Sequence, residues 1–219
     1  MIKNIIFDFD GVIVDSEVLV GRAFSKYLKN LGHNFEEKYF FQFAGQKTIE
    51  SVSYLSSKLS IKNQEKFYND ILEISAEIFS KDLEAVNGAY DYIINSKKNV
   101  FIGSNSMKSR INIGLKKVGL DKYFHQDSII SFEMVKKPKP YPDIYLKVIE
   151  MHNLNKEETI VIEDSSVGVT AAKKAGIKVI ALTAGSHWHQ ERSKKDLIVS
   201  DPFKIIQDYK LLDNIILNL

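Results

Sequence analysis

Short runs of β-branched and aromatic residues recur along the chain, with helical patterns between several of them. The segments 109–118 and 144–152, which precede the third and fourth runs, carry apolar residues at helical spacing. This alternation predicts an α/β fold with a parallel sheet that helices cover on both faces. The first run is apolar at consecutive positions, as expected for a strand buried on both sides. The predicted strands lie at 3–9, 99–103, 127–131, 159–163 and 177–182.

The segment between the first two runs breaks this rhythm. Apolar residues such as Val20 and Phe24 recur there at the spacing of one helix face. Roughly 65 residues of helical pattern stand where a βα connection usually takes only a few. We therefore expect a small helical cap at 16–83, inserted into a Rossmann-like α/β core formed by 1–15 and 84–219.

Composition narrows the class of protein. The 219 residues are 44% hydrophobic and 26% charged, which is typical of a soluble globular protein. A net charge of +2 argues against a nucleic-acid partner, and the absence of cysteine excludes disulfides and thiolate chemistry. The N-terminal sequence MIKNIIFDFDG has no signal-peptide pattern, and no apolar run approaches transmembrane length. We expect a cytoplasmic monomer or weak dimer without a membrane partner.

Two aspartates end the first predicted strand. Asp8 and Asp10 stand at i and i+2, so both side chains can point to the same side of the sheet. Open α/β sheets bind ligands at this carboxyl end of the strands. A single aspartate there is more often a turn former or a helix cap, but two buried like charges need a compensating partner. A cation is the simplest one.

A second acidic pair, Glu163 and Asp164, ends the predicted strand 159–163. Two strand ends with carboxylate pairs suit a hard cation that takes oxygen ligands, and Mg²⁺ is the one we expect. The alternative is a helix cap, in which Asp164 or Ser165 accepts hydrogen bonds from free backbone amides.

Two further segments carry groups suited to a phosphate. Ser104 ends the strand in VFIGSNS, and Asn105 continues toward a helix, so a hydroxyl and backbone amides meet at a helix start. An ordinary N-cap serine is the alternative. Lys139 stands among three prolines in KKPKPYPDIY, which restricts its backbone and suits a fixed positive charge. A solvated basic loop or a PxxP-type ligand would explain the same pattern.

Taken together and in this order, the four elements resemble the haloacid dehalogenase (HAD) superfamily. The matching stretches are DFDGVIVDSE, the serine of VFIGSNS, the lysine of KPYPD and VIEDS. The cap after the first strand places the resemblance in the group of β-phosphoglucomutase-like and 6-phosphogluconate phosphatase-like enzymes. The lysine of the family pattern falls on Lys139 rather than Lys137.

The resemblance implies phosphoryl transfer through an aspartyl-phosphate. Asp8 would attack phosphorus, and Asp10 would protonate the leaving alcohol and then accept a proton from water. Mg²⁺ would be held by Asp8, the backbone carbonyl of Asp10, Asp164 and Glu163. The transferring phosphoryl oxygens would be held by Ser104, the Asn105 amide and Lys139.

The presence of Asp10 favours a phosphate ester, because the dehalogenases and phosphonate hydrolases of this family lack an aspartate there. The mutases of the group carry a histidine in the cap shortly after the first motif, where this chain has Val18, Leu19 and Val20. The interpretation is therefore a Mg²⁺-dependent phosphatase of a small sugar phosphate or sugar-acid phosphate. A sugar phosphomutase and a non-catalytic binding protein are the alternatives.

Substrate choice is expected to lie in the cap. Lys47 and Arg22 suit a carboxylate or a second phosphate, although charged residues of helices usually face water. His187, Trp188 and His189 form either a rim loop of the site or a surface turn.

Overall fold

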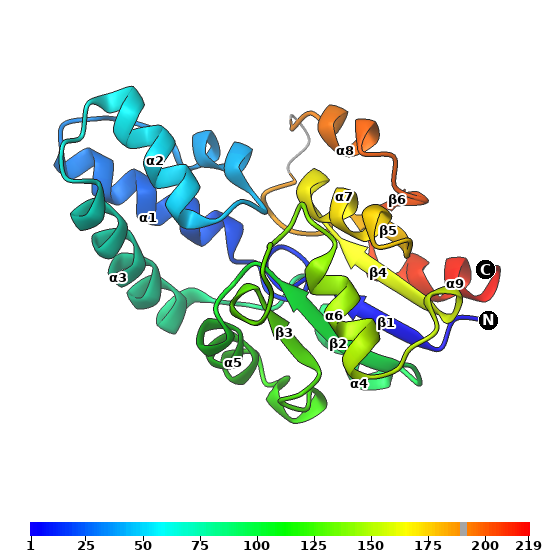
Figure 1. The fold of residues 1–219 in the computed structure, drawn as a ribbon. Helices are drawn as coiled ribbons and strands as arrows, with labels where there is room; N and C mark the ends of the chain where they lie inside the picture. The colour runs from blue at the N-terminus through cyan, green and yellow to red at the C-terminus, as the bar shows by residue number, and fades with distance from the viewer. Residues whose placement is uncertain (189–191) are drawn as a thin grey trace.

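The computed structural model describes residues 1–188 and 192–219, and its centre is a parallel β-sheet (Figure 1). Within these residues six strands lie in the order β3-β2-β1-β4-β5-β6. The parallel α/β sheet predicted from the sequence is confirmed, and each of the five predicted runs contains a strand. β6 was not predicted, because it has three residues and only one of them is buried. The strands are β1 (Asn4–Phe7), β2 (Asn99–Ser104), β3 (Ile129–Ser131), β4 (Thr159–Glu163), β5 (Lys178–Leu182) and β6 (Lys204–Ile206).

Helices cover both faces of the sheet. Ile5 and Phe7 of β1 pack into one apolar cluster, while Ile6 packs into another on the opposite face. The first face is covered by α4 (Ala89–Asn95), α5 (Lys108–Lys117) and α9 (Leu212–Leu217), and the second by α6 (Asp143–Met151), α7 (Ser166–Lys174) and α8 (Lys195–Val199). Short 3₁₀ helices lie at η2 (Asp121–Tyr123), η3 (Phe132–Met134), η4 (Lys156–Glu158) and η5 (Tyr209–Leu211). None of the described helices is long and apolar enough to cross a membrane.

Residues 16–83, between β1 and α4, are largely helical, and we call this part of the molecule the cap. It contains α1 (Glu17–Asn30), η1 (Glu37–Phe43), α2 (Thr48–Leu59) and α3 (Gln64–Asp82). The arrowheads of β2 and β4 point toward these helices, so the cap lies beyond the carboxyl end of the sheet (Figure 1).

The cap has an apolar core of its own. Phe24 and Phe67 meet edge to face with ring centroids 6.0 Å apart, and Tyr27 stacks on Phe67 at 4.6 Å. The cluster around these rings is separate from the two clusters against the sheet. This cluster supports the prediction that residues 16–83 form one unit, while Leu19 and Phe79, near the base of the cap, pack into the cluster against the sheet.

The two chain segments that enter and leave the cap are paired with each other. Val14 forms an antiparallel bridge with Ala85, and the Asp15 amide donates to the carbonyl of Glu84 at 2.9 Å. The Val86 amide donates to the carbonyl of Ile13 at 2.9 Å. The cap therefore joins the core at one hydrogen-bonded base rather than through two independent linkers.

Replacing Phe67 by alanine should destabilise the cap by about 3–5 kcal/mol, because this ring is buried and the space it leaves cannot fill completely. Native-state hydrogen exchange should show faster exchange in α1 and α3 while the sheet strands keep their protection. The matched control is F203A, since Phe203 is 51% exposed and its loss should cost less than about 1 kcal/mol. Equal effects on cap helices and sheet strands would contradict a separate cap core.

Candidate active site

A cavity of about 210 Å³ lies between the carboxyl end of the sheet and the cap. Polar side chains from the core line one side of it, and a mixture of polar and apolar side chains from the cap lines the other. The core contributes Asp8, Asp10, Ser104, Asn105, Ser106, Arg110, Lys139 and Glu163, and the cap contributes Glu17, Val20, Phe24, Phe40, Gln46, Lys47 and Thr48. Six of the seven core residues singled out from the sequence therefore line one cavity, and Asp164 is the exception.

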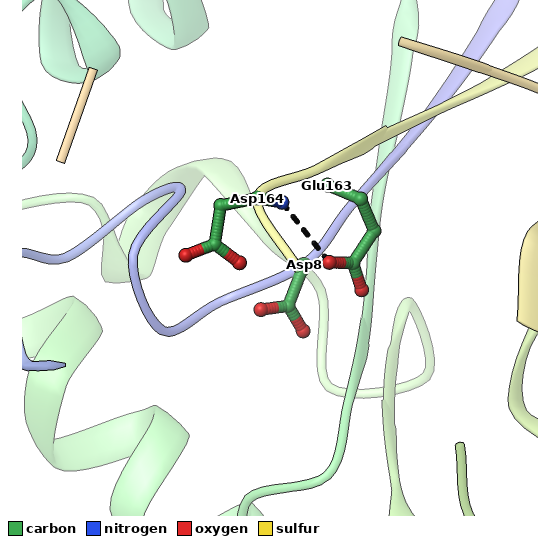
Figure 2. A group of neighbouring side chains, drawn as sticks. All are labelled: Asp8, Glu163 and Asp164. Carbon is green, nitrogen blue, oxygen red and sulfur yellow. Dashed lines mark hydrogen bonds between the residues drawn. The ribbon is translucent and has the colours of Figure 1, made fainter. Parts of the chain in front are cut away.

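Three buried carboxylates, two of which line this cavity, lie close together (Figure 2). Asp8, Glu163 and Asp164 each place one oxygen within 4.8 Å of the others. The cause is strand order: Phe7 pairs with Ile162 in the parallel ladder of β1 and β4, so both strands end at the same level. Residues more than 150 positions apart in sequence thus form one acidic cluster.

The cluster carries an electrostatic cost. Burial raises the pKa of Asp8 well above its usual range, and the charges of Glu163 and Asp164 raise it further, while Lys139 acts in the opposite direction. Burial and the charge of Glu163 likewise raise the pKa of Asp164. Positive charge near these oxygens would relieve the repulsion.

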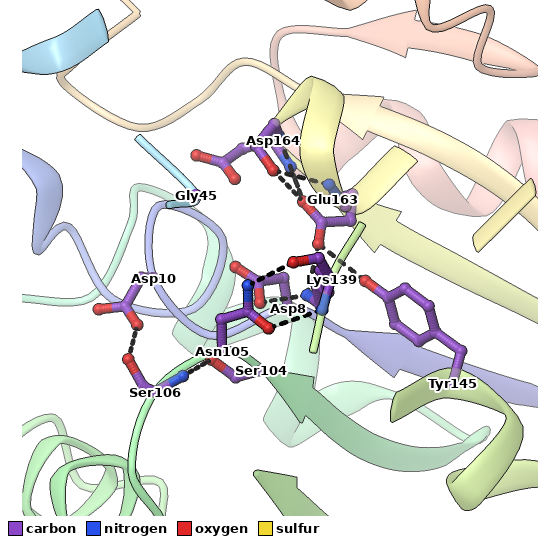
Figure 3. A network of polar contacts seen from close by, with 12 residues as sticks. Asp8, Asp10, Gly45, Ser104, Asn105, Ser106, Lys139, Tyr145, Glu163 and Asp164 are labelled. Atoms are coloured by element: carbon purple, nitrogen blue, oxygen red, sulfur yellow. Dashed lines mark hydrogen bonds and ion pairs between the residues drawn. The ribbon is translucent and has the colours of Figure 1, made fainter. Parts of the chain in front are cut away.

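Lys139 supplies part of that charge. Its Nζ lies 2.6 Å from Oδ1 of Asp8 and 2.5 Å from Oε1 of Glu163. Although burial disfavours its charged form, the carboxylates of Asp8 and Glu163 raise the pKa of Lys139. Asn105 fixes the lysine backbone from both sides: its Oδ1 accepts from the Lys139 amide at 3.0 Å, and its Nδ2 donates to the Lys139 carbonyl at 3.3 Å (Figure 3).

Glu163 connects this pair to the rest of the site. Its Oε1 also accepts from the Tyr145 hydroxyl at 2.7 Å. Its Oε2 accepts from the amides of Asp164 and Ser165 at 3.0 and 3.2 Å, and from the Ser165 hydroxyl at 3.1 Å. Ser165 in turn is the N-cap of α7, because its side chain accepts from the amide of Gly168. The helix N-cap that the sequence offered as an alternative to a cation site is therefore present together with the acidic cluster.

Asp164 is bonded differently. Among the described residues, neither of its carboxylate oxygens accepts a hydrogen bond of good geometry, although both are buried. Nε2 of His187 lies 2.9 Å from Oδ2. Buried carboxylate oxygens of this kind, beside those of Asp8, are the ligand type that a hard divalent cation takes. The donor set therefore fits a metal ion.

Asp10 points away from Asp8, toward Ser106 (Figure 3). Its Oδ1 accepts from the Ser16 hydroxyl at 2.5 Å and from Nη2 of Arg110 at 2.7 Å, and its Oδ2 accepts from the Ser106 hydroxyl at 2.5 Å. The guanidinium of Arg110 also lies 4.3 Å from the ring centroid of Phe79 in α3. Sequence reasoning missed these partners, because a single arginine on a helix usually indicates a solvated face.

Ser104 and the cap candidates occupy different surroundings. The Ser104 hydroxyl is buried at the end of β2 and accepts from the Ser106 amide at 3.0 Å. Lys47 lines the cavity, with its Nζ 5.1 Å from the ring centroid of Phe132. Arg22 is not brought to the cavity: it pairs with Asp82 at 2.7 Å and Glu37 at 3.5 Å on the outer face of the cap.

Glu17 is a cavity residue that the sequence did not single out. It opens α1, where an acidic residue indicates no more than helix stabilisation. Its Oε1 accepts from the amide of Gly45 at 3.1 Å. Burial raises the pKa of Glu17 to about 7, and Asp164 and Asp10 add to this rise while His187 opposes it.

The segment around Trp188 lies beside the acidic cluster. His187 is fully buried, and the Arg192 guanidinium stacks on the Trp188 ring at 4.0 Å. Of the two interpretations from the sequence, the rim loop fits the position of His187, and His189 lies outside the described residues.

The raised pKa of Glu17 predicts a pH-dependent penalty to stability. A carboxyl group whose pKa is about 7 in the folded protein and ordinarily 4.5 destabilises the fold as pH rises from 4.5 to 7. We therefore expect E17Q to be more stable than the wild type by about 1–3 kcal/mol at pH 8, and by less than about 0.5 kcal/mol near pH 4.5. Denaturant unfolding at both pH values measures this, with E65Q on the exposed cap surface as control. A difference that does not change with pH would contradict the prediction.

Comparison with known proteins agrees with this geometry. A family model described as haloacid dehalogenase-like hydrolase matches residues 5–182. A phosphorylated carbohydrates phosphatase from Thermotoga maritima is 32% identical over 182 residues, which is 81% of this chain and 83% of the relative. A 6-phosphogluconate phosphatase from Escherichia coli is 27% identical over 189 residues, 85% of each chain.

A solved structure from Thermotoga maritima, provisionally described as a β-phosphoglucomutase, matches all of both chains with a TM-score of 0.77 and 27% identity. The superfamily resemblance drawn from the four motifs is thereby confirmed, and so is the α/β fold it implied. The match of the family model over most of the residues shows that the chain belongs to the haloacid dehalogenase-like hydrolase family.

Proposed function

We propose that this protein is a Mg²⁺-dependent phosphatase that hydrolyses a small phosphate monoester, a sugar phosphate or a sugar-acid phosphate. The observation that carries the proposal is the buried Asp8 carboxylate, 2.6 Å from the Lys139 ammonium on the floor of a small cavity. A nucleophile, a fixed positive charge and further acidic groups meet there, as phosphoryl transfer requires. The named phosphatases among the relatives support the same reaction class.

The chemistry divides between the two aspartates. In the first step an oxygen of Asp8 forms a bond to phosphorus while the ester P–O bond breaks, and Asp10 gives its proton to the leaving oxygen. In the second step Asp10 takes a proton from water, whose oxygen bonds to phosphorus as the Asp8–phosphorus bond breaks and inorganic phosphate leaves. Asp10 lines the same cavity as Asp8, while its carboxylate points away from Asp8. In an in-line displacement the leaving oxygen lies on the side of phosphorus opposite the attacking oxygen, so this separation suits a proton donor to the leaving group.

The remaining residues of the core hold charge in place. The Ser104 hydroxyl, the Asn105 amide and Lys139 would bind the phosphoryl oxygens. The cation would be held by Asp8, the backbone carbonyl of Asp10, Asp164 and, as the fourth predicted ligand, Glu163. When bound, Mg²⁺ supplies positive charge that offsets the repulsion between carboxylates and phosphoryl oxygens.

The side chains of the cap bear on the choice between a phosphatase and the alternative, a sugar phosphomutase. The structural likeness to a protein provisionally described as a β-phosphoglucomutase favours the alternative. Val20, however, lines the cavity in the stretch where those mutases carry a histidine, so an apolar side chain faces the substrate there. We therefore favour the phosphatase. Lys47, which also lines the cavity, is the proposed partner of a second anionic group on a small phosphorylated metabolite.

The first prediction concerns the nucleophile. Asp8→Asn should lower Mg²⁺-dependent phosphate release by at least about 10³-fold, because the amide is a far weaker nucleophile. Release from sugar phosphates, sugar-acid phosphates and phosphoglycolate measures this, with isomerisation of β-glucose 1-phosphate assayed in parallel. The control D127N changes an exposed aspartate and should behave as the wild type. Isomerisation without net phosphate release would establish the mutase instead, and silence in both assays would favour a binding protein.

A second prediction concerns the cation. Asp164→Asn should weaken Mg²⁺ binding by at least about 10-fold, since it removes a charged oxygen ligand from the buried cluster. Isothermal titration measures the affinity directly. The single tryptophan, Trp188, adjoins His187, which contacts Asp164, so its fluorescence gives a second readout. Unchanged Mg²⁺ affinity in D164N, with the same result for the D127N control, would remove Asp164 from the metal site.

A further inference from the structure

Residues 44–47, between η1 and α2, form a loop that we call the recognition loop because it carries Lys47. Its backbone lies directly against the core. Gly45 has φ +80°, and a Cβ atom there would lie 2.6 Å from both Cβ and Oγ of Ser165. Ser165 belongs to the segment that follows β4 and carries Asp164. The recognition loop is therefore the place where the cap meets the acidic end of the sheet.

One hydrogen bond ties this loop to the start of the cap. The amides of Ala44 and Gln46 donate to carbonyls within the same stretch of chain, those of Phe41 and Phe43. The amide of Gly45 donates instead to the carboxylate of Glu17, 28 positions away. Glu17 lies two residues after Asp15, whose amide is bonded to Glu84 at the base of the cap, so the hydrogen bond ties the loop to this base.

Lys47 belongs to the loop that this hydrogen bond holds. Two residues after Gly45, its side chain lines the cavity, and its Nζ lies 5.1 Å from the centroid of Phe132, which follows β3 in the core. Within the described residues no carboxylate lies within ion-pair distance of Lys47. A lysine held over the cavity without an acidic partner is suited to an anionic group of the substrate.

The position of Glu17 is electrostatically unfavourable for its charged form. It shares the cavity with Asp10, and burial together with the neighbouring acids disfavours its charged form. A glutamine would avoid that penalty, and an alanine would leave the Gly45 amide without its partner. The hydrogen bond from the Gly45 amide is the contact that Glu17 provides at this position.

We propose that Glu17 is a positioning residue that anchors the recognition loop, so that Lys47 faces an anionic group of the substrate distant from the transferred phosphate. The inference rests on the proposed phosphatase function and deepens it, since it assigns substrate discrimination to a hydrogen bond between two parts of the cap. It concerns binding of the distal group and leaves the phosphoryl chemistry of Asp8 and Asp10 unchanged.

Steady-state kinetics of E17A and E17Q test the proposal. With 6-phosphogluconate, whose carboxylate is a distal anion, E17A should raise KM about 10-fold and change kcat less than about threefold. With p-nitrophenyl phosphate, which has no distal anion, KM should change less than about threefold. E17Q keeps an oxygen that accepts from the Gly45 amide and should stay within about threefold of the wild type. E65A, which removes an exposed glutamate from the cap, is the matched control.

A double-mutant comparison separates anchoring from direct contact. K47M should raise KM for 6-phosphogluconate, and E17A added to K47M should raise it by less than about twofold more. Effects of E17A and K47M that multiply would show that Glu17 touches the substrate itself and would overturn the proposal. Failure of E17Q to restore KM, or a loss confined to kcat, would do the same.

Hydrogen exchange gives a readout that needs no substrate. The Gly45 amide should exchange at least about 10-fold faster in E17A than in the wild type, while the Gln46 amide, bonded to Phe43, should be unaffected. Unchanged exchange at Gly45 would overturn the anchoring. If the wild type released no phosphate from either ester, the proposed function would fail, whereas the exchange experiment would still decide whether Glu17 holds the loop.

Discussion

The ammonium group of Lys139, held between the carboxylates of Asp8 and Glu163, is the contact on which the rest of the site depends. Three acidic side chains are buried at one end of the sheet, and this lysine is the cation that the protein itself places among them. Several contacts fix its position. Asn105 bonds to both the amide and the carbonyl of Lys139, and the Tyr145 hydroxyl donates to Glu163, the carboxylate that Lys139 also contacts. Because Asp8, Lys139 and Glu163 are buried, water screens the interactions between their charges only weakly.

The core and the cap contribute different kinds of groups to the cavity. The core supplies charges at fixed distances, because neighbouring parallel strands end at the same level. The cap supplies Val20 and Phe24 from α1 and Lys47 from a loop, so its contribution depends on how that helix and that loop are held. Asp10 contacts both parts of the molecule, because it accepts hydrogen bonds from Ser16 at the start of the cap and from Arg110 of the core. The groups that we propose for catalysis and for recognition thus come from different parts of the molecule and line one cavity.

The sequence was sufficient for the features that short-range patterns encode. Asp8 and Asp10, two positions apart after an apolar strand, and Glu163 at the end of another, could be placed at one sheet edge because parallel topology brings such ends together. Arg110 could not, because its partner is 100 positions away and nothing in α5 marks it. Glu17 was missed for a related reason: its carboxylate is in the cavity only because the recognition loop folds back over it. Arg22 shows the converse, a charge of suitable type that two acidic neighbours hold on the outer face of the cap.

The paired base of the cap has a consequence for how this architecture can vary. Because Val14 bridges Ala85, the chain leaves the core and returns to it at neighbouring points, and the cap is a closed excursion from the sheet. Insertions, deletions or wholesale replacement within such an excursion leave the strand order and the acidic cluster undisturbed. A descendant of this protein can therefore exchange its cap for one that admits a different leaving group and inherit the phosphate chemistry intact.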